Sequence, residues 1–466
     1  MLFNSFEFLL FFPIVTFLYY ITPGHIRWIT LLIASCIFYG FFIPSYLFIL
    51  LTIILIDYTA GIKIENTYHK KTWLVISICA NVLLLSVFKY YNFFIENFNG
   101  LTGSHFILLN IILPIGLSFH TFQSISYTIE VYRGKQKAVR HLGYYALYVM
   151  FYPQLVAGPI ERPQHLFPQL YAKHNFAWNN IFEGIRLMIW GLVKKIVIAD
   201  RLGDFVEGVF NRPSDVSCGS IWLALLFFGI QIYADFSGYS DIALGCAKCL
   251  GIELKINFNR PYLSKNIKEF WQRWHISLSQ WFRDYLYIPL GGNKRGDLRK
   301  QLNILLTFCI SGFWHGAGWT FIIWGLLHGF YMVVYNCLKK YFDKINIGKY
   351  IGWVITMCCV FFGWIFFRAP SLHHAIDFIR SGLQVQNFSW QSILNVPVTY
   401  MTYGRTTLII ILFTSSYMFV FEKYSLPRLI NLNKYFARDI FLINFNILLF
   451  IFLGIFHKTS FIYFQF

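Results

Sequence analysis

Two histidines are candidates for chemistry because each lies among apolar and aromatic residues. His275 follows Trp274 in the chain, and His315 follows Trp314. An ionisable side chain at membrane depth is costly, so its presence indicates a function. Imidazole has an unperturbed pKa of about 6.5, which lets it accept and return a proton at physiological pH. Either histidine could therefore act as a general base that activates an alcohol for acyl transfer.

A serine nucleophile carried by the protein is disfavoured. The sequence contains no Gly-x-Ser-x-Gly elbow and no evident Ser-His-Asp spacing. We therefore expect the nucleophile to be a hydroxyl group of the substrate.

The position of His315 predicts an imidazole deep in a membrane. Basic residues at 294–300 precede an apolar helix that covers about 301–314. At about 1.5 Å per residue, this helix extends about 21 Å into a hydrocarbon core about 30 Å thick. Gly312, Gly316 and Gly318 permit close backbone approach or a break in the helix. The alternative is a histidine hydrogen-bonded between packed helices, without a catalytic role.

The segment 269–290 has the pattern of an interfacial or re-entrant amphipathic helix. Its apolar residues recur at steps of three and four, and His275 falls on the same face. Arg283 lies on the opposite, polar side. The alternative is a membrane anchor in which a neighbouring group satisfies His275. The apolar face comprises Trp271, Trp274, Leu278, Trp281, Phe282 and Tyr285.

Polar residues are concentrated between two apolar runs at 231–241, and they include Asp235, Ser237, Tyr239 and Asp241. Two carboxylates in such a place need partners. They either orient an imidazole or hold the fold together, and the pattern favours the structural role.

A metal site is not expected. His328 follows His315 by thirteen residues, which directs it to a different helix face. Cys246 and Cys249 have metal-ligand spacing, but no second cysteine pair or histidine cluster accompanies them. His120 is interpreted as a packing residue.

Composition identifies a polytopic membrane protein. Of the 466 residues, 57% are hydrophobic and only 13% are charged, compared with about 25% charged residues in soluble domains. The first segment lacks a basic leading region and a cleavage site, so it is expected to stay as a membrane helix. The net charge of +18 is explained by basic cytoplasmic loops, which argues against nucleic-acid binding.

The predicted fold is all-α, with roughly 11–14 membrane-embedded helices of about 20 residues or fewer. Lysine and arginine in the loops place the N-terminus outside. We predict one membrane domain over 1–466, divided into N-terminal spans at 1–140, catalytic segments at 141–340 and C-terminal spans at 341–466. An external loop is expected near 369–406. The predicted spans are 2–21, 28–43, 46–62, 73–90, 106–131, 142–157, 181–199, 219–235, 238–252, 301–318, 319–337, 349–367, 407–422 and 438–456.

One stretch cannot be a single helix. Pro153, Pro159, Pro163 and Pro168 interrupt residues 142–180. Irregular backbone at membrane depth is tolerated only where protein or water surrounds it. We therefore expect this stretch to line a cavity.

Three long motifs resemble the membrane-bound O-acyltransferase family, and in particular its bacterial alginate O-acetylation branch. They are Trp274-His-Ile-Ser-Leu-Ser279, Trp281-Phe-Arg-Asp-Tyr-Leu-Tyr-Ile-Pro-Leu-Gly-Gly-Asn293 and Phe313-Trp-His-Gly-Ala-Gly-Trp319. The start of the chain and the segments 154–163 and 233–243 resemble the same branch. The likeness covers almost the whole chain.

The resemblance implies a ring of helices around a thinned centre with a central tunnel. His315 matches the family's catalytic histidine, reachable from both compartments, and His275 matches a second position where some members carry asparagine. Trp314 and Trp274 are then expected to line the acyl tunnel. We also assign Arg283, Asp235, Ser237 and Tyr239 to substrate binding.

The resemblance further implies transfer of an acetyl group, from acetyl-CoA or a carrier-bound thioester in the cytoplasm, to an extracytoplasmic polysaccharide. A partner acetyltransferase would take part, in the cytoplasmic (inner) membrane of a bacterium. No permanently bound cofactor and no metal are expected. Two alternatives stay open: transfer of D-alanine from a carrier protein to teichoic acid, and a transporter or channel whose histidines relay protons.

Overall fold

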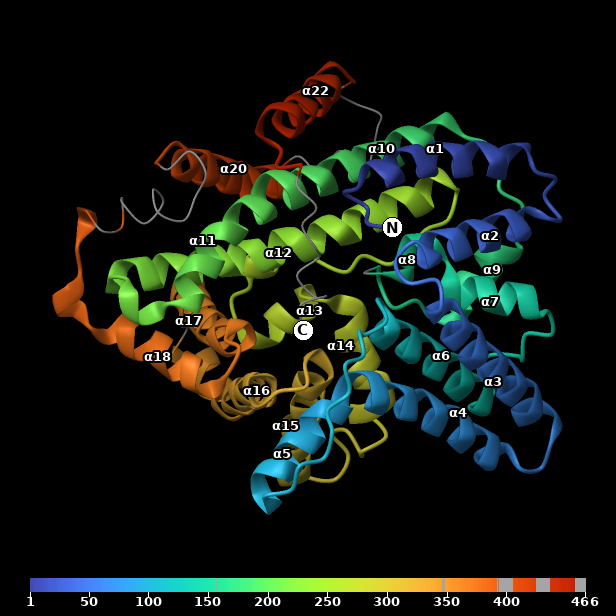
Figure 1. The fold of residues 1–466 in the computed structure, drawn as a ribbon, viewed down its shortest axis with the longest axis horizontal. Coiled ribbons are helices and arrows are strands. Elements are labelled where there is room, and N and C mark those ends of the chain that lie inside the picture. The colour runs from blue at the N-terminus through green and yellow to red at the C-terminus, as the bar shows by residue number, and fades with distance from the viewer. Residues whose placement is uncertain (157, 346–347, 392, 394–404, 425–435, 457–466) are drawn as a thin grey trace. The chain divides into compact units, whose positions relative to one another are not determined.

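The computed structural model describes residues 1–156, 158–345, 348–391, 393, 405–424 and 436–456. These residues form helices and turns, and no β-strand occurs among them. Figure 1 traces the helices from the N-terminus in blue to the C-terminal segments in red. The chain divides into two compact units: residues 1–188 with 240–256, and residues 189–239 with 257–466.

The first unit begins with apolar helices whose side chains enclose a small polar cluster. Asp57 of α3 is fully buried and accepts hydrogen bonds from Ser77 Oγ at 2.6 Å and Asn81 Nδ2 at 2.9 Å, both on α4. Ser77 also bonds Thr128 of α6 at 3.1 Å. Such bonds are what a buried carboxylate requires. The elements are α1 (Phe6–Ile21), α2 (Arg27–Gly40), α3 (Tyr46–Asn66), α4 (Lys70–Leu85), η1 (Ser86–Tyr90), α5 (Tyr91–Thr102) and α6 (Leu117–Tyr132).

The predicted span at 106–131 is wrong in its first part. Helix α6 begins only at Leu117, after Gly116 with a φ of 75°. A Cβ at Gly116 would lie 2.5 Å from the carbonyl oxygen of Leu155. The close approach and the left-handed backbone both require glycine here, so the helix cannot extend toward residue 106.

Short helices follow in the proline-rich stretch, as predicted, although Pro168 lies inside one of them. They are α7 (Leu142–Met150), α8 (Tyr152–Leu155) and α9 (Pro163–Tyr171). Pro153 and Pro163 lie in the first turns of α8 and α9, where a missing N–H costs nothing. Helix α10 (Trp178–Leu192) then contacts the end of α12 (Cys218–Cys249). A Cβ at Gly184 would lie 2.5 Å from the carbonyl oxygen of Gly245.

Helix α12 is one continuous helix of 32 residues, so the prediction of two spans at 219–235 and 238–252 is wrong. Gly238 does not break it. A Cβ at Gly238 would lie 2.8 Å from the carbonyl oxygen of Gly191. The glycine therefore allows close packing. Asp235, one of the polar residues of α12, is neutralised by an ion pair described below.

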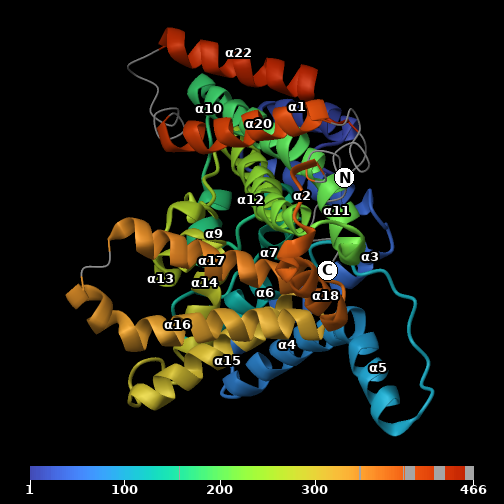
Figure 2. The same cartoon turned by 90° about the vertical axis from the view of Figure 1, so that its left-hand side faces the viewer.

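The second unit holds the later elements, of which α15, α16 and α17 lie side by side (Figure 2). The elements are η2 (Val193–Ala199), α11 (Asp200–Asn211), η3 (Pro213–Asp215), η4 (Pro261–Leu263), α13 (Ile267–Arg273), α14 (Ile276–Phe282), η5 (Arg283–Tyr287), α15 (Asp297–His315), α16 (Trp319–Ile345), α17 (Lys349–Arg368), α18 (Leu372–Leu383), η6 (Val385–Asn387), α20 (Arg405–Tyr424) and α22 (Phe436–Leu453).

Part of the predicted loop at 369–406 is helical. Helix α18 occupies Leu372–Leu383, and Ser371 caps it by accepting a bond from the His374 N–H at 3.3 Å. Residues 392 and 394–404 lie outside the described residues. The external location of this segment stays a prediction.

Six helices of the described chain are long and apolar enough to cross a membrane, and three further apolar helices are shorter. This confirms the prediction of an all-α, multi-pass membrane protein. The total of 11–14 embedded helices, the ring arrangement and the central tunnel stay predictions.

Candidate functional site

His315 is the last residue of α15, at a point where α15 and α16 are in backbone contact. A Cβ at Gly312 would lie 2.2 Å from the carbonyl oxygen of Phe321, and one at Gly325 would lie 2.3 Å from that of Phe308. Of the two possibilities that the sequence left open, close backbone approach or a helix break, the structure shows close approach at Gly312. It brings the end of α15 against the first turns of α16.

Aromatic rings surround His315. Its ring centroid lies 4.9 Å from that of Trp314, 5.0 Å from Trp324 and 5.4 Å from Phe367. The side chain is 4% exposed. His315 is therefore enclosed by aromatic side chains, and its access from both compartments stays a prediction.

His275 lies at a break between two short helices. The sequence pattern predicted one helix over 269–290, but α13 ends at Arg273, α14 begins at Ile276, and His275 has a φ of 41°. A left-handed residue other than glycine is strained. The prediction that His275 lies on a continuous helical face is therefore wrong.

Asn257 holds the break in place. Its side-chain oxygen Oδ1 lies 3.0 Å from His275 Nδ1, 3.0 Å from Ser277 Oγ and 3.3 Å from the Ser277 backbone nitrogen. Its carbonyl oxygen accepts a bond from the Ile276 N–H at 2.9 Å. Sequence reasoning missed Asn257, although an asparagine between Ile256 and Phe258 is a polar residue in an apolar setting.

A path of aromatic rings connects the two histidines within the second unit. Trp274 contacts Trp364 at 5.0 Å, Trp364 contacts Phe367 at 5.4 Å, and Phe367 contacts His315. On its other side, His275 packs against Phe236 of α12 at 4.7 Å. The structure therefore brings Trp274, Trp314 and both histidines into one aromatic cluster. His328 belongs to the same cluster, 4.9 Å from Trp324.

The environment of His275 favours a neutral imidazole. Helix α14 is not among the candidate membrane spans, and His275 is only 1% exposed. Burial lowers the pKa of His275 to about 3, because a low-dielectric environment disfavours the charged form. A neutral imidazole is the form that can accept a proton.

Asp235 is engaged in a buried ion pair. Lys195 Nζ lies 2.9 Å from Asp235 and 2.7 Å from Asp200, and all three side chains are at most 4% exposed. Lys195 also lies 5.7 Å from the ring of Tyr239. Ser237 is buried as well. The hydrophobic pattern of 181–199 hid the two lysines of η2 from sequence reasoning.

Arg283 lies on the surface. Its guanidinium Nε bonds Asp284 at 2.8 Å, and its side chain is 60% exposed. His120 lies in the first unit, in ring contact with Tyr39 at 5.8 Å and beside a small cavity. Neither residue is part of the aromatic cluster around the two candidate histidines.

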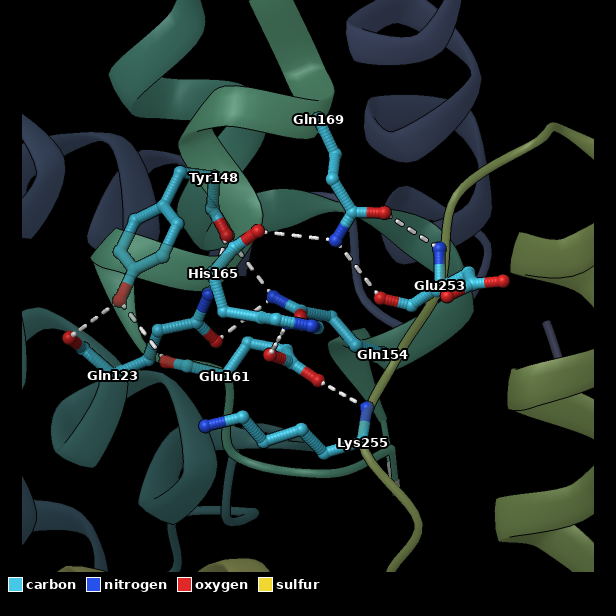
Figure 3. Close-up of polar contacts among 8 residues, drawn as sticks. All are labelled: Gln123, Tyr148, Gln154, Glu161, His165, Gln169, Glu253 and Lys255. Carbon is cyan, nitrogen blue, oxygen red and sulfur yellow. Dashed lines mark hydrogen bonds and ion pairs between the residues drawn. The ribbon is translucent and has the colours of Figure 1, made fainter.

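The proline-rich stretch contributes to a network of hydrogen-bonded side chains within the first unit (Figure 3). Glu161 is fully buried. Its Oε2 lies 2.7 Å from His165 Nδ1, and its Oε1 accepts a bond from the Lys255 backbone N–H at 2.6 Å. Gln154 is also buried and bonds Gln123 at 2.9 Å. The stretch is thus packed through hydrogen bonds.

Charge partners shift two pKa values here. The hydrogen bond that His165 donates to Glu161 raises the pKa of His165, with burial opposing it. Lys248, 2.9 Å from Glu253, lowers the pKa of that carboxyl. The side-chain amide of Gln169 bonds the backbone N–H and the carbonyl oxygen of Glu253 in the same segment, at 2.8 and 3.0 Å. Segment 253–255 is therefore held at two points by residues of the proline-rich stretch.

Comparison with known proteins supports one family. The family model described as "MBOAT, membrane-bound O-acyltransferase family" matches residues 136–375, which include both candidate histidines and Asn257. The chain belongs to the membrane-bound O-acyltransferase family. The resemblance inferred from the motifs is confirmed, and the chain is a membrane acyltransferase of the class that transfers groups other than aminoacyl groups.

Three relatives show the range of this family. The chain is 40% identical to a peptidoglycan O-acetyltransferase of Helicobacter pylori, over 75% of this chain and 72% of the relative. It is 39% identical to the probable alginate O-acetylase AlgI of Azotobacter vinelandii, over 80% and 76%. It is 30% identical to the teichoic acid D-alanyltransferase of Bacillus subtilis, over 57% and 71%.

Proposed function

We propose that the protein is an O-acetyltransferase that moves an acetyl group from a cytoplasmic thioester, acetyl-CoA in the first instance, toward an extracytoplasmic polysaccharide. The observation that carries the proposal is the aromatic cluster holding His275 and His315 in one unit. O-acetyltransferases among the relatives support the acetyl group as cargo and a glycan as acceptor. The acetyl group passes either directly or through a partner acetyltransferase, at the bacterial cytoplasmic membrane.

In the proposed reaction, His315 is the general base. A hydroxyl oxygen of the acceptor attacks the thioester carbonyl, and His315 takes the hydroxyl proton as the C–O bond forms. The C–S bond then breaks, and the departing thiolate of the donor receives that proton from the His315 imidazolium, which restores the neutral base. His275 assists by positioning the acceptor or relaying the proton. The chemistry requires no resident cofactor.

The aromatic walls have a role in the same reaction. Trp314, Trp274, Trp324 and Phe367 exclude water from the reacting atoms, which protects a thioester from hydrolysis. Arg283 is available at the surface to an anionic donor, although Asp284 competes for it. Asp235 pairs with Lys195, Tyr239 lies beside the same lysine, and Ser237 is buried in the same helix. We therefore assign these residues to shaping the site rather than to direct substrate contact.

The donor is tested separately from the acceptor. A teichoic acid D-alanyltransferase is among the relatives. A carrier-bound D-alanyl group, which is an aminoacyl group outside the class given above, is therefore the alternative that the test must exclude. Purified protein in nanodiscs is incubated with radiolabelled acetyl-CoA, acetyl carrier protein or D-alanyl carrier protein, together with envelope polysaccharide. Label transfer from acetyl-CoA supports the proposal, and transfer from D-alanyl carrier protein alone contradicts it.

The role of His315 is tested in cells. His315→Ala should abolish acetyl ester in the envelope at an unchanged level of membrane-inserted protein. His120→Asn, in the first unit, is the matched control and should retain the ester. A His315→Ala protein that folds and still forms the ester contradicts the proposal, and retained substrate flux in liposomes with no ester chemistry indicates a transporter.

A further inference from the structure

Asn257 is a buried amide on which three hydrogen bonds converge. The residue is 1% exposed, and its Oδ1 faces His275 Nδ1, Ser277 Oγ and the Ser277 backbone nitrogen. It precedes His275 by eighteen residues. The contact therefore depends on the tertiary fold.

One of the three bonds identifies which amide atom faces the group. The Ser277 backbone nitrogen can only donate a hydrogen bond, so the atom it faces must be an acceptor. Between the two ends of an asparagine side chain, only the oxygen accepts. The amide orientation, which is otherwise inferred from hydrogen-bond networks, is thereby determined by the backbone.

The same oxygen determines the tautomer of His275. A carbonyl oxygen has no proton to give, so Nδ1 of His275 must be the donor in the 3.0 Å contact. A neutral imidazole carries one proton, and its other nitrogen, Nε2, then bears the lone pair. In histidines generally, the bond made by one ring nitrogen decides the state of the other.

Two backbone hydrogen bonds keep the His275 imidazole in this position. The Ile276 N–H bonds the carbonyl oxygen of Asn257 at 2.9 Å, and the Asn259 N–H bonds that of Arg273 at 2.9 Å. These two bonds pair the segment around Asn257 with the break between α13 and α14. They also compensate for the strained, left-handed φ of His275.

We propose that Asn257 is a positioning residue that fixes His275 as the Nδ1–H tautomer and so presents Nε2 as the basic nitrogen at the site. The neutral amide orients the imidazole without adding a charge that would favour imidazolium. The proposal rests on the acyl-transfer function proposed above, because it names the nitrogen through which His275 positions the acceptor hydroxyl or relays its proton.

The test combines a spectroscopic and a kinetic measurement. Full-length protein labelled with ¹⁵N-histidine is examined in nanodiscs by NMR, and the His275 signals are assigned by their loss in His275→Asn. The nitrogen shifts should report Nδ1 protonated and Nε2 unprotonated. Asn257→Leu, similar in size but without an acceptor, should release this tautomer and lower kcat about 10- to 100-fold with little change in KM.

Two further variants separate positioning from folding. Asn257→Asp retains the acceptor oxygen and should retain the Nδ1–H tautomer. Ser277→Ala removes one donor but leaves the bond between Asn257 and His275, so its kcat should stay within about twofold. Wild-type protein with Nε2 protonated would overturn the proposal. So would Asn257→Leu with an unchanged tautomer, or with a released tautomer and an unchanged kcat.

Failure of the proposed function gives a different result. The tautomer is measured without substrate, so it stands independently of any acyl transfer. If His315→Ala still forms the ester while His275 shows the expected tautomer, the proposed reaction is wrong and Asn257 keeps only its structural effect on His275.

Discussion

His275 and His165 both make a hydrogen bond through Nδ1, but their partners differ in charge. His275 is 1% exposed and faces the neutral amide of Asn257 at 3.0 Å. The His165 side chain is 35% exposed and faces the carboxylate of Glu161 at 2.7 Å. The first imidazole lies among aromatic rings, and the second lies in a network of glutamine, glutamate and backbone groups (Figure 3).

The charge of the hydrogen-bond partner therefore determines which protonation state of each imidazole is favoured. A carboxylate favours the protonated form, and the pKa of His165 is accordingly raised. An amide adds no such charge, and burial lowers the pKa of His275. His165 is suited to holding segment 253–255 through Glu161, whereas His275 stays neutral and keeps a lone pair on one ring nitrogen.

The largest expected effect is on the rate of acetyl transfer, and it should differ between the region of His315 and the region of His165. His315→Ala should lower the kcat of acetyl transfer by at least about 100-fold, because it removes the proposed general base. His165→Ala should lower it by less than about tenfold, since His165 has a holding role. Ester formation by purified protein measures both. Equal losses in the two variants, at equal protein stability, would erase the distinction.

A second prediction concerns Asp235. It precedes Phe236, whose ring packs on His275, and Lys195 neutralises the charge of Asp235. Lys195→Met should destabilise the protein by about 3–5 kcal/mol, because two buried carboxylates lose their shared cation. Thermal unfolding in detergent measures this. Lys248→Met, at a more exposed ion pair, is the control, and a loss as small as that of the control contradicts the prediction.

The carboxylate beside His165 gives a smaller effect. Glu161→Gln keeps the shape but removes the charge, and it should cost about 1–3 kcal/mol because a buried charged acceptor is lost. His373→Gln breaks a histidine–aspartate pair whose imidazole is 79% exposed, and should cost less than about 0.5 kcal/mol. Chemical unfolding of both variants measures the difference, and equal costs would show that burial of Glu161 is irrelevant.

The smallest expected effect is a dependence of stability on pH. The folded-state pKa of His165 is raised, so its bond to Glu161 contributes stability that is full below a pH of about 6.5 and is lost as pH rises through the folded pKa. The difference in unfolding free energy between wild type and His165→Gln should be smaller at about pH 9 than at about pH 6. Solvent screening keeps it below about 1 kcal/mol. A difference that grows with pH contradicts this assignment.

Sequence alone was sufficient for the features that depend on local pattern. Long apolar runs were sufficient to predict an all-α, multi-pass membrane protein, although not the bounds of every helix, and basic loops gave the expected orientation. Gly312 and Gly316, before and after His315, permitted close backbone approach or a helix break, and a backbone contact between Gly312 and α16 is present. The motifs around His275 and His315 were long enough to identify the family.

The tertiary structure alone decided the environment of each side chain. Helical periodicity predicted a continuous helix through His275, because the pattern does not register a bond from Asn257, eighteen residues earlier, that stabilises a left-handed residue. It likewise did not register Lys195 as the partner of Asp235, forty residues apart in number. Partners distant in the chain meet only after packing, and these partners determine tautomer and charge.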